Sequence, residues 1–229
     1  ELLIGQDSEH TYIIQRMKAI IIEIRPETTS ISSFRLRPTS PLAYQPGQWM
    51  YIRLNENLKH HFTISSSPTE DFLQITTMYR EESEFKKALF ASPAGTIVDI
   101  EGPRGSFVLD EKDTSPRLFI AGGIGITPFR SMLKYNRDKQ LNLPLKLIYS
   151  VKTRADGAFM SELVEAMVVE SETEGRLDAA KIKALVPDWN ERTWWLCGPP
   201  AMVDAFVELA QRLGLPPEKI KSEEFSGYQ

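Results

Sequence analysis

A glycine-rich segment in the second half of the chain, Gly122-Gly-Ile-Gly-Ile-Thr-Pro128, could bind a phosphate group. It follows a continuous apolar run, residues 118–121, which predicts a strand covered on both faces. The glycines let the backbone approach a ligand closely, while Thr127 and Pro128 are typical of a helix N-cap and a first helical position. Because a helix N-terminus attracts anions, the segment predicts a phosphate site. A tight strand-to-helix turn without a ligand is the alternative.

The segment His60-His-Phe-Thr-Ile-Ser-Ser-Ser-Pro68 places two imidazoles, an aromatic ring and several hydroxyls on one expected strand and its exit. Alternation along a strand directs His60 and Phe62 to one face, and His61 and Thr63 to the other. The paired histidines therefore face apart, and with no third ligand nearby we expect no metal site. From composition alone, a half-buried strand followed by a Ser-Pro turn is the favoured interpretation.

Two further segments carry groups that could do chemistry. Residues 100–107 contain two glycines around Pro103 and Arg104, which predicts either a turn with an exposed guanidinium for a phosphate or a surface hairpin. Cys197 comes just before an expected helix N-terminus, where the pKa of a thiol can fall. A nucleophilic thiol needs a nearby base, and all three histidines lie in the first half. A buried structural cysteine is therefore the usual interpretation.

Bulk properties exclude several classes of protein. The 229 residues, 41% hydrophobic and 25% charged, suffice for one large domain or two small ones. The net charge of −4 does not favour nucleic-acid binding. There is no signal-peptide pattern and no apolar run of the roughly 20 residues that a membrane span needs. A single cysteine can form no internal disulfide and cannot hold an iron–sulfur cluster. The chain begins with Glu1, so we expect a trimmed terminus or a piece of a longer protein.

Residues 12–109 predict a β-rich half. Short β-branched and apolar runs are separated by Pro and Gly, which is typical of a small antiparallel barrel or sandwich. Ser83 is a plausible N-cap for one helix, Glu84–Ala91. The six expected strands are Met17–Ile24, Ile31–Leu36, Trp49–Leu54, Phe62–Ser66, Phe72–Tyr79 and Thr96–Ile100.

From Arg117 onward the pattern alternates between strand and helix, which predicts a parallel sheet with helices on both faces. Ligands of such folds bind beyond the carboxyl ends of the strands, so the Gly122 turn, residues 150–154 and residues 197–202 should meet there. This convergence predicts a nucleotide site. After the first strand, the expected elements are a strand Leu145–Val151, helices Phe159–Val168 and Ala179–Leu185, a strand Thr193–Cys197, a helix Ala201–Leu213 and a strand Ile220–Phe225.

Six short motifs in this order resemble those of the ferredoxin–NADP reductase superfamily over nearly the whole chain. The resemblance implies an N-terminal six-stranded antiparallel Greek-key β-barrel that binds flavin, residues 1–112. It also implies a C-terminal Rossmann-like α/β domain with a parallel sheet that binds NAD(P), residues 113–229. The motifs are Pro46-Gly-Gln48, His60-x-Phe-Thr63, Gly102-Pro-x-Gly-x-Phe107, Gly122-Gly-x-Gly-x-Thr-Pro128, Cys197-Gly-Pro-Pro-x-Met202 and Glu223-Glu-Phe225.

The resemblance implies FAD, with FMN less favoured, on the barrel. His60 takes the place of the family's usual Arg, as in the His-Pro-Phe-Thr motif of ferric reductases and NADPH oxidases, and a histidine binds phosphate in a pH-dependent way. Phe62 would lie against the isoalloxazine, and Thr63 would hydrogen-bond near flavin N5. The expected flavin-binding residues are His60, Phe62, Thr63, Ser65, Ser83, Phe225 and Tyr228.

The resemblance also implies NADPH or NADH as electron donor, with catalytic residues Thr63, Cys197 and Glu223 around the hydride-transfer position. Lys152 and Arg154 favour NADPH, whereas the absence of the Ser/Thr-Arg pair often found near residues 168–175 leaves NADH open. The expected coenzyme-binding residues are Gly122, Gly123, Gly125, Thr127, Ser150, Lys152, Arg154, Cys197, Gly198, Pro199 and Met202.

On this basis the chain is expected to be a flavoprotein reductase that passes electrons singly to a ferredoxin, an iron–sulfur protein, a heme protein or a ferric complex. The alternative is an electron-transfer module of a larger, membrane-associated complex. We expect it in the cytoplasm or on the cytoplasmic face of such a complex. A third possibility, a fold member that only senses nucleotide, is opposed by the presence of Thr63, Cys197 and Glu223.

Overall fold

The computed structural model describes residues 2–6 and 11–225, with side chains from residue 14 onward. The chain divides into two compact units. The first contains residues 1–109 and 130–139, and the second contains residues 110–129 and 140–229. The 112/113 domain boundary stays a prediction, since the units are not divided at one point in the chain.

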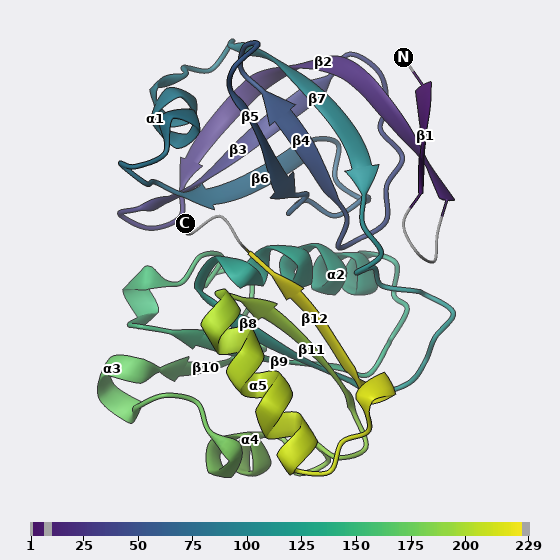
Figure 1. Cartoon of the computed structure of the whole chain (residues 1–229), viewed down its shortest axis with the longest axis vertical. Helices are drawn as coiled ribbons and strands as arrows, with labels where there is room; N and C mark the ends of the chain where they lie inside the picture. The colour runs from purple at the N-terminus through teal and green to yellow at the C-terminus, as the bar shows by residue number, and fades with distance from the viewer. Residues whose placement is uncertain (1, 7–10, 226–229) are drawn as a thin grey trace. The chain divides into compact units, whose positions relative to one another are not determined.

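The first unit is a nearly closed antiparallel barrel (Figure 1). Six strands follow one another in the order β5-β4-β7-β2-β3-β6, with β1 added on β2. The last strand of the unit, β7, lies between β2 and β4, as in a Greek key. The strands are β1 (Leu2–Gln6), β2 (Thr11–Pro26), β3 (Ile31–Pro38), β4 (Trp49–Arg53), β5 (Lys59–Thr63), β6 (Leu73–Met78) and β7 (Ile97–Arg104).

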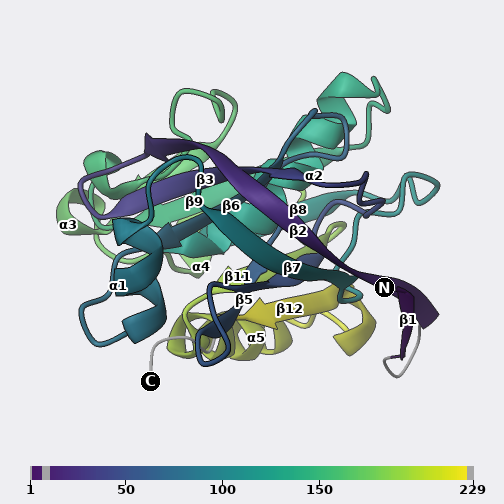
Figure 2. The same ribbon diagram turned by 90° about the horizontal axis from the view of Figure 1, so that it is seen from above.

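The long strand β2 lets the barrel curve. It pairs with β7 through residues 15–20 and with β3 through residues 19–26, and its register with β3 shifts between Ile21 and Glu23. A bulge of this kind bends a strand and increases its twist. In the view of Figure 2, β2 passes between β3 and β7. The interior is filled by alternating apolar residues of these strands, among them Ala19, Ile21, Phe34, Met50, Ile52, Ile75 and Ile100.

The predicted helix of the barrel is present as α1 (Glu84–Ala91). Its N-cap is Ser83, whose hydroxyl accepts a hydrogen bond from the Lys86 N–H. Two differences from the expected barrel concern β1, which the sequence did not reveal, and residues 100–107. Those residues continue β7 as far as Arg104, whose guanidinium pairs with Glu101 and is mostly covered, so the first of the two alternatives, a turn with an exposed guanidinium, is not observed.

The second unit holds a five-stranded parallel sheet in the order β10-β9-β8-β11-β12. Leu118 and Ile120 of β8 face the core formed with α4 and α5. Phe119, between them, stacks on Phe129 of α2 with ring centroids 4.5 Å apart, so both faces of β8 are buried. The elements are β8 (Arg117–Gly122), α2 (Ile126–Asp138), β9 (Leu145–Val151), β10 (Met167–Glu170), α3 (Ser171–Glu174), α4 (Ala179–Leu185), β11 (Thr193–Gly198), α5 (Pro200–Arg212) and β12 (Ile220–Glu224).

The predicted helix Phe159–Val168 is wrong. Phe159, the first residue of the expected helix, has a φ of 62°, which lies in the left-handed region, and only isolated turns follow before strand β10. Phe159 and Leu163 are buried, but Val164 is 79% exposed. Successive turns bury some of the apolar side chains of this segment, and the spacing of these side chains in the sequence resembles that of a helix.

The start of α2 also differs from the prediction. Thr127 lies inside the helix, and its hydroxyl donates to the carbonyl of Ile124. The turn Gly123–Gly125, a single turn of 3₁₀ helix, leads directly into α2 and takes the place of a side-chain cap. Pro128 is the third residue of the helix, still within the first turn, where a missing N–H leaves no hydrogen bond unmade.

Candidate functional site

Strand β5 positions the residues of the expected flavin motif. Phe62 and Thr63 are buried, and the ring of His60 stacks on that of Phe62 with centroids 4.9 Å apart. The hydroxyl of Thr63 is buried and has no hydrogen-bond partner. A buried hydroxyl without a partner is costly, so Thr63 has an unused hydrogen-bonding group that a ligand could satisfy.

The N-terminus of α1 gathers basic side chains that the sequence analysis missed. Lys86 is only 8% exposed, and no carboxylate pairs with its ammonium within the described part of the chain. Burial lowers the pKa of Lys86, and the charge of Arg80 lowers it further. Burial also lowers the pKa of His60, to which Lys86 contributes repulsion. His60, Arg80 and Lys86 thus form a basic cluster beside the helix N-terminus, where an anion would be stabilised.

Ser65 differs from its neighbours in this segment. Its hydroxyl bonds the Gln74 carbonyl at 3.2 Å and the Thr76 hydroxyl at 2.9 Å. Its N–H donates to the Gln74 carbonyl, and its own carbonyl accepts from Arg130 at 2.9 Å. The Ser65 hydroxyl therefore already has hydrogen-bond partners within the first unit. Its expected contact with flavin stays a prediction, and this geometry does not support it.

The glycine turn after β8 is shaped by its packing. A Cβ on Gly125 would clash with the carbonyl of Cys197, and one on Gly122 would clash with the side chain of Met202. Gly123 has a φ of 51°, and a Cβ there would meet nothing within 4 Å. The backbone at Gly123 therefore faces open space, as a turn that receives a phosphate must.

Tyr149 of β9 holds this turn in place and was not singled out from the sequence. Its hydroxyl donates to the Gly123 carbonyl at 3.0 Å and accepts from the Ala158 N–H at 3.1 Å. The only sequence signal for Tyr149 is its position near the carboxyl end of a buried strand.

The turn after β11 lies beside the glycine turn. Ala121 and Cys197 are register partners in β8 and β11. Gly198 has a φ of 159°, and a Cβ on it would come within 2.7 Å of the Met202 side chain and 3.2 Å of the Gly122 carbonyl. Pro199 precedes α5, which begins with Pro200. The sheet thus brings the two predicted turns together, as the sequence predicted for its carboxyl edge.

Cys197 and Glu223 are register partners in β11 and β12. Burial raises the pKa of Glu223 to about 7, and its Oε2 is buried without a hydrogen-bond partner. Burial and the neighbouring Glu223 raise the pKa of the Cys197 thiol well above its usual value. The thiol is therefore protonated at neutral pH, while the carboxyl is present in both its protonated and its ionised form. Thr63 belongs to the first unit, and its proximity to this pair stays a prediction.

The carboxyl end of β9 carries the expected coenzyme-selecting residues. Ser150 is a register partner of Gly122 and lies at the same edge of the sheet. Lys152 and Arg154 are exposed. The Lys152 ammonium lies 3.9 Å from the Glu172 carboxylate, and the backbone N–H of Arg154 donates to the Glu170 carboxylate at 2.7 Å. Basic and acidic groups therefore meet here, and the sequence analysis did not foresee the acidic ones.

Phe225 follows β12, and its N–H donates to the Gly198 carbonyl at 3.2 Å. The alternative covering residue, Tyr228, lies outside the described residues. Within the described part of the chain, no group of three or more His, Cys, Asp or Glu could hold a metal ion. No helix among the described residues is long and apolar enough to cross a membrane.

The expected cofactors fit these groups. The buried Thr63 hydroxyl and Glu223 carboxylate oxygen each have an unused hydrogen-bonding position. Lys86 is a buried cation beside a helix N-terminus, and a phosphate would neutralise it. The open backbone at Gly123 leaves room for a second phosphate.

Two family models match the chain. An FAD-binding domain matches residues 15–125, and an oxidoreductase NAD-binding domain matches residues 119–208.

Individual proteins resemble the chain over most of its length. Flavohemoprotein A of Dictyostelium discoideum is 28% identical, over 87% of this chain and 57% of the relative. An NADPH oxidoreductase of Mycobacterium tuberculosis is 30% identical, over 83% and 55%. The reductase component of propane 2-monooxygenase from Rhodococcus jostii is 27% identical, over 93% and 64%. The chain thus spans 55–64% of the length of these relatives.

Among solved structures, the flavohem-like FAD/NAD-binding domain of nitric oxide dioxygenase from Vibrio cholerae superposes with a TM-score of 0.80. The match covers 91% of this chain and 98% of that domain, at 22% sequence identity. At this identity the likeness shows a shared fold.

Proposed function

The chain belongs to the ferredoxin–NADP reductase superfamily, and from this premise we propose that it takes electrons from NAD(P)H and passes them singly to a protein acceptor. It is an NAD(P)H-dependent flavoprotein reductase with FAD- and NAD-binding domains. When bound, FAD accepts a hydride from the nicotinamide and releases electrons one at a time. The observation that carries the proposal is the buried, unpartnered hydroxyl of Thr63 on the strand of the flavin motif.

On the flavin side, each residue has a proposed task. Thr63 donates a hydrogen bond to the flavin ring, and Phe62 packs against it. His60, Ser83 and the N-terminus of α1 hold the diphosphate, together with the buried Lys86. The phosphate charge would relieve the repulsion between Lys86 and Arg80.

On the coenzyme side, the turn Gly122–Gly125 and the residues Gly198 to Met202 hold the coenzyme's diphosphate and nicotinamide ends. With its pKa at about 7, the Glu223 carboxyl can hold or release a proton near neutral pH, and the protonated Cys197 places no negative charge beside it. Phe225 covers the flavin ring before the coenzyme binds.

NADPH is the proposed donor. Lys152 and Arg154 are exposed at the end of β9, where they could contact a 2′-phosphate, and the Lys152–Glu172 pair is long and mostly exposed, so it competes only weakly. The relative named NADPH oxidoreductase supports the same choice.

The acceptor is a protein with an iron–sulfur or heme centre. Support comes from the relative named as the reductase component of a monooxygenase and from the one named flavohemoprotein. Because the chain spans only part of these relatives, its acceptor could be a separate protein or a further part of a longer chain. Either arrangement would place it on the cytoplasmic side, where NADPH is available.

An anaerobic titration of the purified protein with NADPH, and then with NADH, tests the proposal by following the flavin absorbance. We expect bleaching with both, faster with NADPH. Thr63→Ala should slow reduction about 5- to 10-fold, the loss of about one hydrogen bond, while Thr63→Ser should retain the wild-type rate. A protein that binds no FAD when it is supplied would overturn the proposal.

A further inference from the structure

We propose that His60 takes up one proton when the diphosphate of FAD binds beside helix α1, so that the protein holds FAD tightly below neutral pH and loosely above it. The identity of the ligand rests on the proposed function, whereas the behaviour of the imidazole follows from the geometry of β5 and α1. An arginine at this position would stay charged, so only a histidine makes the affinity respond to pH.

A backbone hydrogen bond fixes the position of one hydrogen on the His60 ring. Its Nδ1 atom lies 2.8 Å from the carbonyl oxygen of His61. A carbonyl oxygen can only accept a hydrogen bond, so Nδ1 carries a hydrogen and donates it. A neutral imidazole has a hydrogen on only one of its nitrogens, and Nε2 is therefore a pure acceptor whenever His60 is neutral.

The oxygens of a bound diphosphate are acceptors too, and this determines which form of His60 can bind them. The neutral ring could donate to a phosphate oxygen only by giving up its hydrogen bond to His61. The imidazolium carries hydrogens on both nitrogens, so it keeps that bond and donates from Nε2 as well. Such a charge-assisted hydrogen bond is also roughly twice as strong as a neutral one. A diphosphate therefore selects the protonated form of His60.

The ring of His60 is held where a diphosphate is expected. It stacks on Phe62 with centroids 4.9 Å apart, and its centroid lies 5.6 Å from that of Phe85 in α1. Phe85 and Lys86 belong to the first turn of this helix, and Lys86 is a buried cation. The imidazole thus lies against a helix N-terminus that attracts anions, next to a lysine whose charge is not neutralised by burial in water.

In the free protein, His60 is mostly neutral at pH 7.5. Burial lowers the pKa of His60 below its usual value of 6.5, the hydrogen bond to His61 opposes this, and the positive charge of Lys86 lowers the pKa further. A diphosphate brings negative charge to the ring, and a nearby opposite charge favours the ionised form. The pKa of His60 therefore rises on binding, and the ring takes a proton from solvent.

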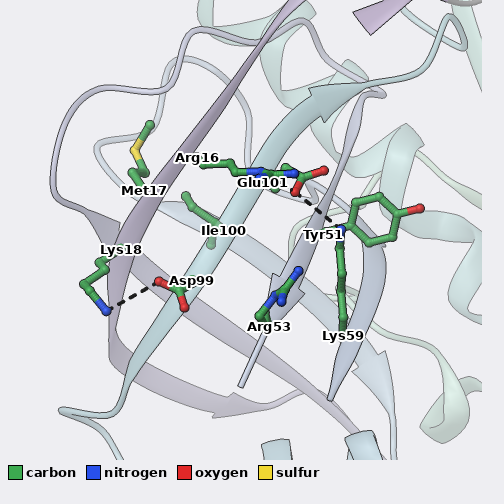
Figure 3. A pocket seen from close by; sticks show the side chains of 9 residues that line it. All are labelled: Arg16, Met17, Lys18, Tyr51, Arg53, Lys59, Asp99, Ile100 and Glu101. Carbon is green, nitrogen blue, oxygen red and sulfur yellow. Dashed lines mark hydrogen bonds and ion pairs between the residues drawn. The ribbon is translucent and has the colours of Figure 1, made fainter. Parts of the chain in front are cut away.

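The other charged groups of β5 face away from this position. Lys59 and His61 alternate to the opposite face of the strand, and the register partner of His60 on β4 is the apolar Ile52. Figure 3 shows Lys59 at a hollow of about 370 Å³ on that opposite face, where it pairs with Glu101 at 3.4 Å. Burial, and then the charge of His60, lower the pKa of His61. Protonation of His60 therefore leaves His61 neutral.

The charged groups on the helix side make the surroundings of His60 positive. Glu84 and Lys87 of α1 pair with each other at 3.2 Å, so their charges offset one another. Arg80 precedes the helix, and its positive charge acts on Lys86. Positive charge on this side disfavours the imidazolium in the free protein, and a bound diphosphate would reverse that effect.

The coupling between the proton and the ligand determines the direction of the pH dependence. Because His60 has the higher pKa in the complex, the affinity for FAD is fully present below the pKa of the free protein. It is lost progressively as the pH rises toward the pKa of the complex. Uptake of one proton means that the Kd for FAD rises about 10-fold per pH unit between these two values.

Calorimetry on the full chain tests the proposal by counting protons. FAD is titrated at pH 7.5 into protein freed of flavin, in two phosphate-free buffers with different heats of protonation, and the difference in binding heat gives the number of protons taken up. Riboflavin, which has the same ring system and no phosphate, is titrated in the same way. The variants are His60→Arg, Lys86→Met and His61→Gln, a matched control that removes the neighbouring imidazole on the other face of β5.

We expect wild type to take up about 0.5 to 1 proton with FAD and none with riboflavin. The Kd of wild type for FAD should rise at least about 10-fold from pH 6 to pH 8.5, whereas that of His60→Arg should change less than about twofold, without proton uptake. His61→Gln should behave as wild type. Lys86→Met should bind FAD more weakly and still take up the proton.

Release of flavin from the purified holoprotein provides a second measurement that needs no removal of flavin beforehand. The holoprotein is diluted rapidly from pH 6 into buffer at pH 8.5, and release is followed by flavin fluorescence. Wild type should release flavin faster than His60→Arg at pH 8.5, because only the histidine loses its charge. At pH 6 the two proteins should differ much less.

Three results would contradict the role of His60. The first is FAD binding by wild type without proton uptake. The second is equal uptake with FAD and riboflavin, which would assign the proton to a group near the flavin ring. The third is uptake that persists in His60→Arg, and its loss in Lys86→Met would then assign the proton to the lysine. A wild-type protein that binds FAD neither at pH 6 nor at pH 8.5 would instead contradict the proposed function.

Discussion

Cys197 and Glu223 are register partners on two adjacent parallel strands, so a thiol and a carboxyl group share one buried position at the edge of the sheet. Burial raises the pKa of the carboxyl to about 7, and burial together with the neighbouring carboxylate raises the pKa of the thiol well above its usual value. A buried pair of this kind makes the second unit sensitive to pH in a range where most carboxyl groups are already ionised.

The first prediction is that Glu223→Gln changes how stability depends on pH. An acid whose pKa rises on folding stabilises the fold while protonated, and this contribution is lost as the pH rises from about 4.5 to about 7. The glutamine variant should therefore become more stable relative to wild type as the pH rises through this range. At higher pH it should remain the more stable of the two proteins. Melting temperatures from pH 4 to 9 measure this, at about 2–4 °C per kcal/mol for a chain of this size. Glu224→Gln, an exposed neighbour, is the control. Parallel curves for wild type and Glu223→Gln would contradict the assignment.

A second prediction concerns Lys86. Lys86→Met keeps the length of the side chain and removes its charge, so it should raise the Kd for FAD about 10-fold or more, the effect of one charge-assisted hydrogen bond. Binding of riboflavin, which has no phosphate, should not change. Fluorescence titrations with both ligands provide the measurement. Lys87→Met removes the same charge from the next residue, which pairs with Glu84, and should leave both affinities unchanged. Equal losses for FAD and riboflavin would mean that Lys86 supports the fold instead.

The third prediction tests coenzyme selection at the end of β9. Arg154→Ala should weaken NADPH about 10-fold and leave NADH unaffected, because only NADPH carries the 2′-phosphate. Glu172→Gln, which frees Lys152, should tighten NADPH about twofold. Arg176→Ala, at another exposed arginine, is the control. Dissociation constants for both coenzymes decide the matter, and an equal effect of Arg154→Ala on both would exclude a 2′-phosphate contact.

A fourth prediction concerns Arg130, which is 3% exposed and donates to both oxygens of Glu70 and to the Ser65 carbonyl. Removing one partner of a buried pair leaves the other charge uncompensated, so Arg130→Met should cost about 3–5 kcal/mol. Urea unfolding of Arg130→Met, Glu70→Gln and the double variant measures the coupling. The double variant should lose less than the two single losses together, and strictly additive losses would show that the pair does not interact.

Much of the fold could be predicted because its signals are local. The barrel strands are separated by Pro and Gly, the cap of α1 is a single residue, and the glycine turn follows an apolar strand. The helix expected at Phe159–Val168 failed because the segment folds as successive turns, and the spacing of their buried apolar side chains resembles that of a helix. The strand β1 was missed because its role is to pair with the extension of β2.

The parts of the candidate site that consist of motif residues could be predicted from the sequence, whereas residues outside the motifs could not. The cofactors and the overall class follow from the motifs and are confirmed by the family matches, whereas the individual site residues stay predictions. Lys86 gave no signal because a lysine in a short amphipathic helix is usually exposed, and its burial emerges only when α1 packs on the barrel. Glu170 and Glu172 could not be foreseen because β10 and α3, which place them beside Lys152 and Arg154, are known only from the structure.

The hydrogen bonds of Tyr149 have a kinetic consequence. Its hydroxyl connects the Gly123 carbonyl to the Ala158 N–H, so the glycine turn is already in one conformation before a nucleotide arrives. A turn that needs no ordering adds no slow step to association, and the encounter of coenzyme with this edge of the sheet should be limited by diffusion and charge. The lifetime of the bound coenzyme, and with it the spacing of successive turnovers, would then be determined by how quickly the product leaves.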